Sequence, residues 1–291
     1  MTALLTLTRI EMRKLTARKL LWVELALLGL LVLALHGALA AALQNPQGAD
    51  LPPEALAELR AALRWPQGLR GALTFANGGE LGGLFVVVLV AAFTAQEYTW
   101  HTVGLWLSRG VSRRRYLAAK ALALLPALAA LVLVTLLSGA VATGLYTWHS
   151  VGALPWQQVA WAELLVDGGR VLLTLLPYAA LTLAVAVLTR STLVTVGLGL
   201  GYTLLVENLA VEVLSLLSPD AARLTRYLPT MLAKAVLQPL QSGMQAQVGV
   251  ASAARDALLA PGPAALGLLA YTAAGLALAW WAFRRQDIPT A

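Results

Sequence analysis

Long apolar runs restrict the fold of this chain more than any other feature of its sequence. A helix of about 20 apolar residues, rising 1.5 Å per residue, crosses the roughly 30 Å hydrocarbon core of a bilayer. Six segments meet this measure, approximately 20–43, 76–96, 116–146, 170–189, 192–217 and 263–283. The third is longer than a bilayer requires and is expected to tilt or to project into water. The sequence therefore predicts an all-α integral membrane protein in which residues 1–291 form one transmembrane domain.

Composition agrees with this fold class. Hydrophobic residues make up 59% of the chain and charged residues 12%, against about 45–50% and 25% in an average soluble domain. The net charge of +7 arises from basic residues between the apolar runs, so it indicates membrane topology rather than nucleic-acid binding. The chain has no cysteine, which excludes disulfides, thiolate nucleophiles and cysteine metal sites. The first apolar run is too long for a signal peptide and is interpreted as a retained span.

Basic residues gather in alternate connections between the predicted spans, as the positive-inside rule requires of cytoplasmic segments. They are Arg9, Arg13, Lys14, Arg18, Lys19, Arg109, Arg113, Arg114, Arg115, Lys120, Arg190, Arg284 and Arg285. The intervening connections carry nearly balanced charge. This asymmetry predicts a multi-pass protein of the inner (cytoplasmic) membrane with both termini in the cytoplasm.

Two connections on the predicted outer side are too long to be simple turns. Residues 44–75 include "LPPEALAELRAALRW", whose leucines and alanines recur at helical spacing, so a short amphipathic helix is expected there. Residues 218–262 are punctuated by prolines but contain the apolar stretch "RYLPTMLAKAVLQPL". Broken helices that dip into the membrane interface are expected in this second segment.

Ionisable residues inside a span are costly and are functional candidates for that reason. Glu24 lies about one turn into the first span, where it is expected to reach the interface or to meet an arginine. His36 is expected to be a helix-packing residue, because the other two histidines offer no ligand pair at metal-binding spacing. Glu207 and Glu212 mark the end of the fifth span or line an outer vestibule of a transport pathway. Their spacing of five does not place them on one helical face.

The fifth span also contains one G-x-x-x-G pair, Gly197 and Gly201. Such a pair allows close approach of another helix, either within the subunit or across a dimer. Catalytic motifs are absent: the sequence has no G-x-x-x-x-G-K-[ST] loop, no H-E-x-x-H and no G-x-S-x-G. The chain is therefore not expected to be an enzyme by itself, and no cofactor or metal site is predicted in it.

A basic segment, "EYTWHTVGLWLSRGVSRRRYLAAK", separates the second and third predicted spans. Its first half predicts a short apolar helix that ends at Gly110, a residue suited to the left-handed C-terminal conformation. Ser112 is suited to cap the next helix. Arg113, Arg114 and Arg115 follow this cap, where the helix dipole disfavours positive charge. Anchoring to anionic headgroups accounts for the arginines, but the apolar helix before them needs a surface on which to be buried.

This segment resembles the permease subunits of ABC-2 type transporters. In that family the second span is followed by a Glu-Tyr-x-x-Gly-Thr element, a short apolar helix and a Ser-Arg-rich run that enters the third span. The matching residues are Glu97, Tyr98, Thr102, Ser108, Arg109, Ser112, Arg113, Tyr116 and Lys120, with His101 in place of the usual glycine. The N-terminal "LLTLTRIEMRKLTARK" is similar to the interfacial elbow helix of the family.

The resemblance implies a permease that exports a substrate when a separate ABC ATPase, carrying ATP and Mg²⁺, cycles. Two permease subunits, as a homo- or heterodimer in membrane lipid, and two ATPases would form the working unit. The implied ATPase-coupling residues are Glu97, Leu105, Trp106, Arg109, Arg113 and Arg115, with Trp106 as the anchor in the ATPase groove and Glu97 paired with one of the arginines. The alternatives are a secondary transporter, a membrane enzyme and a non-transporting anchor or assembly factor. The apolar spans favour a hydrophobic or amphipathic cargo.

Overall fold

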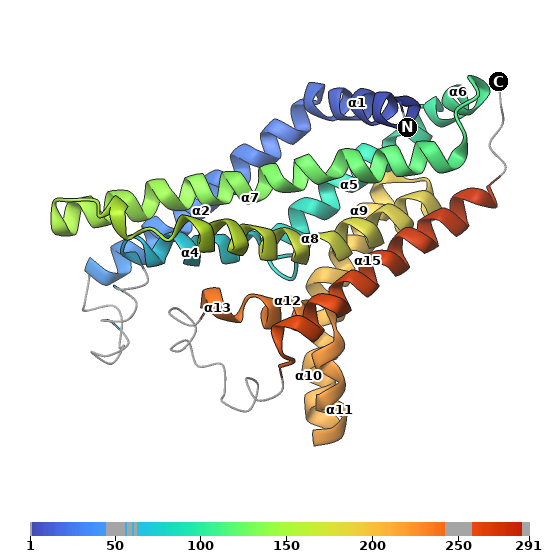
Figure 1. Cartoon of the computed structure of the whole chain (residues 1–291). Helices are drawn as coiled ribbons and strands as arrows, with labels where there is room; N and C mark the ends of the chain where they lie inside the picture. The colour runs from blue at the N-terminus through green and yellow to red at the C-terminus, as the bar shows by residue number, and fades with distance from the viewer. Residues whose placement is uncertain (1, 45–55, 57–59, 61–62, 242–257, 287–291) are drawn as a thin grey trace.

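The computed structural model describes residues 2–44, 56, 60, 63–241 and 258–286 (Figure 1). All secondary structure in these ranges is helical. Six helical segments are long and apolar enough to cross a membrane, which confirms the predicted multi-pass fold. They are α2 (Lys19–Gln44), α5 (Leu81–Thr99), α7 (Arg113–Val151), α8 (Trp161–Thr189), the composite span α9–η3–α10 (Thr192–Leu217) and α15 (Pro261–Arg284).

Two spans begin elsewhere than the apolar pattern predicts. The second begins at Leu81 rather than near residue 76, because α4 (Gln67–Leu73) and η1 (Thr74–Ala76) lead into a tight turn at Asn77. Gly78 in this turn touches α8: its backbone N–H donates to Thr174 Oγ1 at 3.0 Å, and a Cβ there would lie 2.1 Å from the Thr174 carbonyl oxygen. A larger residue would therefore push the turn away from α8.

The fourth span begins at Trp161 rather than near residue 170, although its first turns carry acidic residues. These acids are neutralised across the bundle. Arg70 of α4 lies 2.6 Å from Asp167 and 3.0 Å from Glu163, and Arg170 lies 2.8 Å from Asp167. Because Asp167 is fully buried between two arginines, the helix continues through a stretch that looks too polar in the sequence.

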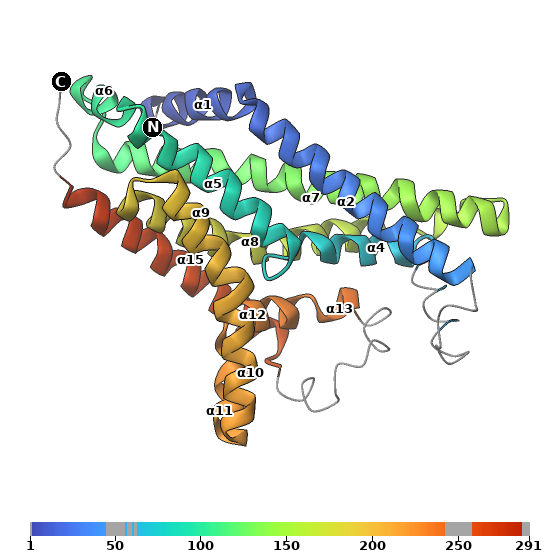
Figure 2. The same cartoon turned by 180° about the vertical axis from the view of Figure 1, so that it is seen from behind.

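The core lies around α8, which packs along α15 on one side and against α5 on another. A second group of contacts joins α7 to α2, α4 and α1 (Thr2–Ala17), as Figures 1 and 2 show from opposite sides. Gly275 lets α15 approach α8 closely, since a Cβ at this position would lie 2.8 Å from the Ala180 carbonyl carbon. In both views α1, the short helix α6 (Thr102–Ser108) and the C-terminal end of α15 lie at one end of the bundle, here called the α6 end.

The fifth span is bent and lightly packed. Its middle is a π-helical turn, η3 (Tyr202–Val206), which separates α9 (Thr192–Gly201) from α10 (Glu207–Leu217). Only 11% of this span is buried within the subunit, compared with 67% of the α8 span. In Figure 2 α10 and α11 extend away from the other helices. Most of the surface of this span is therefore free to meet lipid or a second subunit.

The proline-rich connection after the fifth span is broken into short helices, as predicted. They are α11 (Pro219–Leu224), η4 (Thr225–Tyr227), α12 (Pro229–Val236) and α13 (Gln238–Gln241). Proline occupies the start of α12, where its missing N–H costs nothing. The amphipathic helix predicted in "LPPEALAELRAALRW" falls largely outside the described residues, as does the connection from 242 to 257.

Candidate functional site

The segment between α5 and α7 has the predicted helix, glycine break and second helix. Helix α6 is followed by Gly110 at φ +82°, and the Ser112 side chain accepts a hydrogen bond from the Arg115 backbone N–H at 3.4 Å. His101, which stands where the ABC-2 motif has glycine, separates α5 from α6 at φ +54°. This left-handed conformation is the one that glycine adopts most easily. The backbone break is therefore present although the glycine is not.

The apolar residues of α6 do not form one docking surface. Val103 is buried inside the subunit, and Leu105 is 50% exposed. Trp106 is partly buried, and the Lys14 ammonium of α1 lies 4.5 Å above its ring. Trp106, the predicted anchor for an ATPase, therefore packs against α1 of its own subunit, and its contact with an ATPase stays a prediction. Leu105 is the apolar residue of α6 that faces outward.

Beneath α6 lies a buried charge cluster made of Glu11, Lys14, Glu97 and Lys120. Lys14 Nζ is 2.5 Å from Glu11 Oε1 and 3.2 Å from Glu97 Oε1. Lys120 Nζ is 3.1 Å from Glu11 Oε2 and 3.2 Å from Glu97 Oε2. Each ammonium therefore bridges both carboxylates, and the four charges sum to zero. The cluster joins α1, α5 and α7 at the point where α6 begins.

The remaining hydrogen-bonding capacity of the cluster is also used. Lys120 donates to the Phe93 carbonyl at 3.2 Å and lies 3.9 Å from the centre of the Phe93 ring. Tyr116 donates its hydroxyl hydrogen to Glu97. A buried ionic group is tolerated only when such partners replace its water. The arginine partner predicted for Glu97 is wrong, because two lysines and a tyrosine occupy its carboxylate.

The arginines that follow Gly110 have separate roles. Arg113 Nη1 donates to three backbone carbonyls at the C-terminal end of α15, those of Phe283 at 2.9 Å, Arg284 at 3.0 Å and Gln286 at 2.7 Å. A cation at this end of a helix satisfies carbonyls without helical partners and complements the dipole. Arg113 therefore fixes α15 against the start of α7.

Arg109 and Arg115 have exposed side chains on a groove between α1 and the loop from α6 to α7. The groove has a volume of about 420 Å³, and Leu7 and Ile10 form its apolar wall. Its combination of apolar wall and arginine rim suits a protein segment that presents apolar and acidic side chains. Of the predicted coupling residues, Leu105, Arg109 and Arg115 are thus available at the surface, whereas Glu97, Trp106 and Arg113 hold the α6 end together.

The two glutamates predicted to line a vestibule differ in solvent exposure. Glu207 is 1% exposed and accepts a hydrogen bond from the Tyr178 hydroxyl at 2.8 Å. Glu212 is exposed on α10. Only Glu207 therefore points into the bundle, and the geometry that brings it there is the π-helical turn before it, which the sequence pattern did not indicate.

The first span carries the other two ionisable candidates. His36 is a packing residue, as predicted: its Nδ1 is 2.8 Å from the Val32 carbonyl oxygen, and its ring meets Phe75 edge-on at 5.4 Å. Glu24 is 4% exposed, and neither carboxyl oxygen has a hydrogen-bond partner among the described residues. Of the two alternatives predicted for Glu24, the contact with an arginine is therefore absent among the described residues. In the described ranges no group of three His, Cys, Asp or Glu residues is placed to hold a metal ion.

Six long apolar helices, and secondary structure that is helical throughout the described residues, define the chain as a multi-pass, α-helical membrane protein. Residues 79–289 match the family described as "Protein of unknown function (DUF2705)", and the chain belongs to that family. The match begins at the turn before α5 and runs past the end of α15, so it includes α6, Glu97 and Glu207. No curated protein matches the chain.

Proposed function

We propose that the chain is the permease subunit of an ATP-driven ABC-2 type exporter. In this proposal it spans the inner membrane with both termini in the cytoplasm and pairs with a second permease subunit. Separate ATPase subunits bind and hydrolyse ATP with Mg²⁺ and dock on the α6 end. The observation that carries the proposal is α6 itself, a short helix between two spans that is fastened from beneath and exposes Leu105 outward.

The buried charge cluster gives this helix a mechanical connection to the spans. Trp106 of α6 contacts Lys14, and Lys14 is bonded to Glu97 at the end of α5. Lys120 connects the same carboxylate to α7. A force applied to α6 by a partner is therefore transmitted to α1, α5 and α7 through charged contacts rather than through a flexible loop. Chains of packed and charged side chains of this kind can carry coupling between a partner and distant elements.

The arginine-rimmed groove supplies the second docking feature. Arg109 and Arg115 lie on the groove between α1 and the α6–α7 loop, next to the exposed Leu105 of α6. An ATPase surface with an apolar pocket for Leu105 and acidic residues for the arginines would match both. Charged rim residues at such an interface chiefly affect association rate and salt dependence, whereas the apolar contact affects dissociation.

The test is co-purification with a co-expressed ABC ATPase from the same genome, and ATP hydrolysis after both are reconstituted in lipid. Leu105→Asp and the double change of Arg109 and Arg115 to Glu should each reduce ATPase binding at least tenfold, while membrane insertion is retained. Val151→Asp provides the control, since Val151 is 58% exposed at the opposite end of α7. Wild-type binding in both test variants would contradict docking at α6.

A secondary transporter is the second candidate, and the buried acid Glu24 is the observation that favours it. A carboxyl group 4% exposed in a span, with no hydrogen-bond partner among the described residues, is of the kind that carries protons in such transporters. The two functions are separated by measuring transport when the ATPase partner carries an inactivating change in its phosphate-binding loop. Continued transport that a protonophore abolishes would favour the secondary transporter, and its loss would favour the ATP-driven permease.

A further inference from the structure

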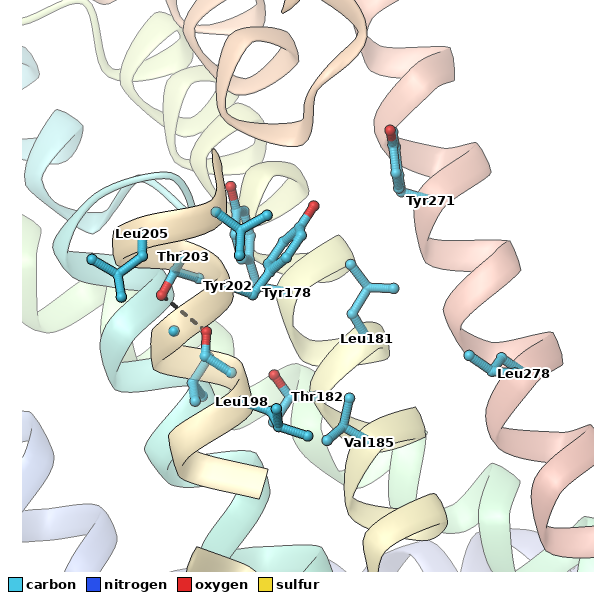
Figure 3. Close-up of a pocket in the computed structure, with 14 residues that line it drawn as sticks. Tyr178, Leu181, Thr182, Val185, Leu198, Tyr202, Thr203, Leu205, Tyr271 and Leu278 are labelled. Atoms are coloured by element: carbon cyan, nitrogen blue, oxygen red, sulfur yellow. Dashed lines mark hydrogen bonds between the residues drawn. The ribbon is translucent and has the colours of Figure 1, made fainter. Parts of the chain in front are cut away.

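A cavity of about 570 Å³ lies between α8, the composite fifth span and α15 (Figure 3). This volume falls within the range of about 300–1,000 Å³ that is typical of small-molecule sites. Most of its wall is apolar and is contributed by side chains such as Leu181, Val185, Leu198 and Leu278. The body of any ligand that fits here must therefore be apolar.

One end of the cavity is aromatic. Tyr178 of α8, Tyr202 of η3 and Tyr271 of α15 line it, and Figure 3 shows their hydroxyl groups directed toward the same end. The Tyr178 hydroxyl donates to Glu207 Oε2 at 2.8 Å and lies 3.2 Å from Thr230 Oγ1. The Tyr271 hydroxyl donates to the Tyr227 carbonyl at 3.1 Å. Tyr178 and Tyr202 therefore lie side by side at this end, Tyr271 lies across from them on α15, and Glu207 lies beyond the Tyr178 hydroxyl.

The π-helical turn explains how Glu207 reaches this position. The Glu207 backbone N–H donates to the Tyr202 carbonyl, which is the i to i+5 bond of a π-turn. Residues five apart lie on different faces of an α-helix, but they come nearly into line across a π-turn. Tyr202 and Glu207 thus face the same side of the fifth span. Insertions of this kind recur at functional sites.

The charges near this end favour a cation. Glu207 is 1% exposed, and its Oε1 has no hydrogen-bond partner among the described residues. A positive charge in front of the tyrosine rings is attracted by this carboxyl oxygen, whereas a negative charge is not. Tyrosine faces attract cations as well, most strongly where water is excluded. An anion at the same position would be repelled by Glu207 and by the electron-rich faces of the rings.

We propose that this cavity binds a lipophilic organic cation, with its apolar body between α8, the fifth span and α15 and its charge among the three tyrosine rings in front of Glu207. The binding step requires neither nucleotide nor a partner subunit. It is therefore independent of the ATPase docking proposed above, and each can fail without the other.

The purified chain in lipid nanodiscs is titrated calorimetrically with two probes that share a tetraphenyl body, the tetraphenylphosphonium cation and the tetraphenylborate anion. Heats from empty nanodiscs are subtracted to remove partitioning into lipid. We expect saturable binding of the cation with one site per chain and at least tenfold weaker binding of the anion. Equal affinity for the two probes, or binding of neither, would overturn the proposal.

Two variants locate the site. Glu207→Gln should weaken binding of the cation at least tenfold, whereas Glu212→Gln, the same change at an exposed position of α10, should leave it unchanged. Leu278→Trp should block the cavity from α15 and reduce binding even if Glu207→Gln does not fold. Size-exclusion elution and the unfolding midpoint verify the fold of each variant. Wild-type affinity in a folded Leu278→Trp chain would place the cation elsewhere and refute the site.

Discussion

Lys120 of α7 and Glu97 of α5 lie 3.2 Å apart with side chains that are 0% and 3% exposed. Replacement of Lys120 by Met leaves Glu97 and Glu11 with only one ammonium group between them. Because breaking a buried ion pair on one side costs about 3–5 kcal/mol, the unfolding midpoint should fall strongly. The nine tryptophans of the chain allow this to be followed by intrinsic fluorescence in detergent.

Two further variants separate this effect from general loss of packing. Lys14→Met should be milder, since the Lys14 side chain is 28% exposed and water can replace part of its contact. The double variant of Lys120→Met with Glu97→Gln should be more stable than Lys120→Met alone, because one uncompensated carboxylate is removed. An unchanged midpoint in Lys120→Met would show that the four charges do not stabilise the fold.

Arg113 and Arg115 are neighbouring arginines with different contacts, and they form a matched pair. Arg113→Ala removes the donor to three carbonyls at the end of α15 and should lower the free energy of unfolding by about 1–2 kcal/mol. Arg115→Ala removes an exposed side chain and should change it by less than about 0.5 kcal/mol. Thermal unfolding measures both. Equal destabilisation by the two changes would argue against the contact between Arg113 and α15.

Gly199, not the G-x-x-x-G pair around it, is the close-contact glycine of α9. A Cβ on Gly199 would lie 2.5 Å from Val87 Cγ1, whereas nothing lies within 4 Å of one on Gly197 or Gly201. Gly199→Ala should therefore destabilise the chain by about 1–3 kcal/mol through overpacking against a stiff valine. Gly197→Ala should be neutral or stabilising by up to about 1 kcal/mol, because alanine favours a helix. A Val87→Ala change that fails to rescue Gly199→Ala would contradict this contact.

Gly197 and Gly201 remain candidates for contact with a second subunit. The structure places no described atom near either position, which agrees with the low burial of the fifth span. Gly197→Leu should then leave the fold of the monomer intact and weaken dimerisation in lipid. Cross-linking or single-molecule photobleaching in nanodiscs measures this, and an unaltered dimer fraction would assign the glycine pair to a lipid-facing surface.

Two exposed serines, one before the start of α7 and one near its end, test the predicted orientation. Ser108 ends α6, and Ser150 lies near the end of α7. Because the chain has no cysteine, Ser108→Cys and Ser150→Cys each introduce one thiol with little change in volume. In intact cells a membrane-impermeant maleimide should label Ser150→Cys and spare Ser108→Cys until the cells are lysed. Labelling of Ser108→Cys alone before lysis would show that the chain has the opposite orientation.

The sequence predicts the parts of this fold that depend on local chemistry. Apolar runs locate the six spans, and Gly110 and Ser112 correctly indicate where α6 ends and α7 begins. The starts of the second and fourth spans are missed for a common reason. They depend on contacts with a distant segment, the turn at Gly78 against α8 and the arginine of α4 against Asp167.

The candidate sites are harder to predict, because they are assembled from residues far apart in the chain. Glu11 and Lys120 are separated by more than 100 positions, yet their side chains are 3.1 Å apart. In the sequence Lys120 belongs to the motif that resembles the ABC-2 family, and no pattern indicates that Glu11 lies beside it. Glu207 is a candidate in the sequence because it is an acid within a span. The direction of its side chain depends on a π-turn, and a pattern of 3.6 residues per turn places Glu207 on the wrong face.

The way in which the buried charge cluster is shared among helices has a consequence for motion. Helix α1 contributes Glu11 and Lys14, while α5 and α7 contribute Glu97 and Lys120, so the boundary between α1 and the spans divides the cluster into two electrically neutral halves. Each half retains its own ion pair, at 2.5 Å and 3.2 Å, when the boundary opens. Helix α1 can therefore separate from the spans without leaving an unpaired charge buried on either side. A separation of α5 from α7 would instead leave an unpaired acid, Glu97, on one side and an unpaired base, Lys120, on the other. Within this cluster, the boundary between α1 and the spans is thus the one at which the charges can separate with each side still paired, and it runs beneath α6.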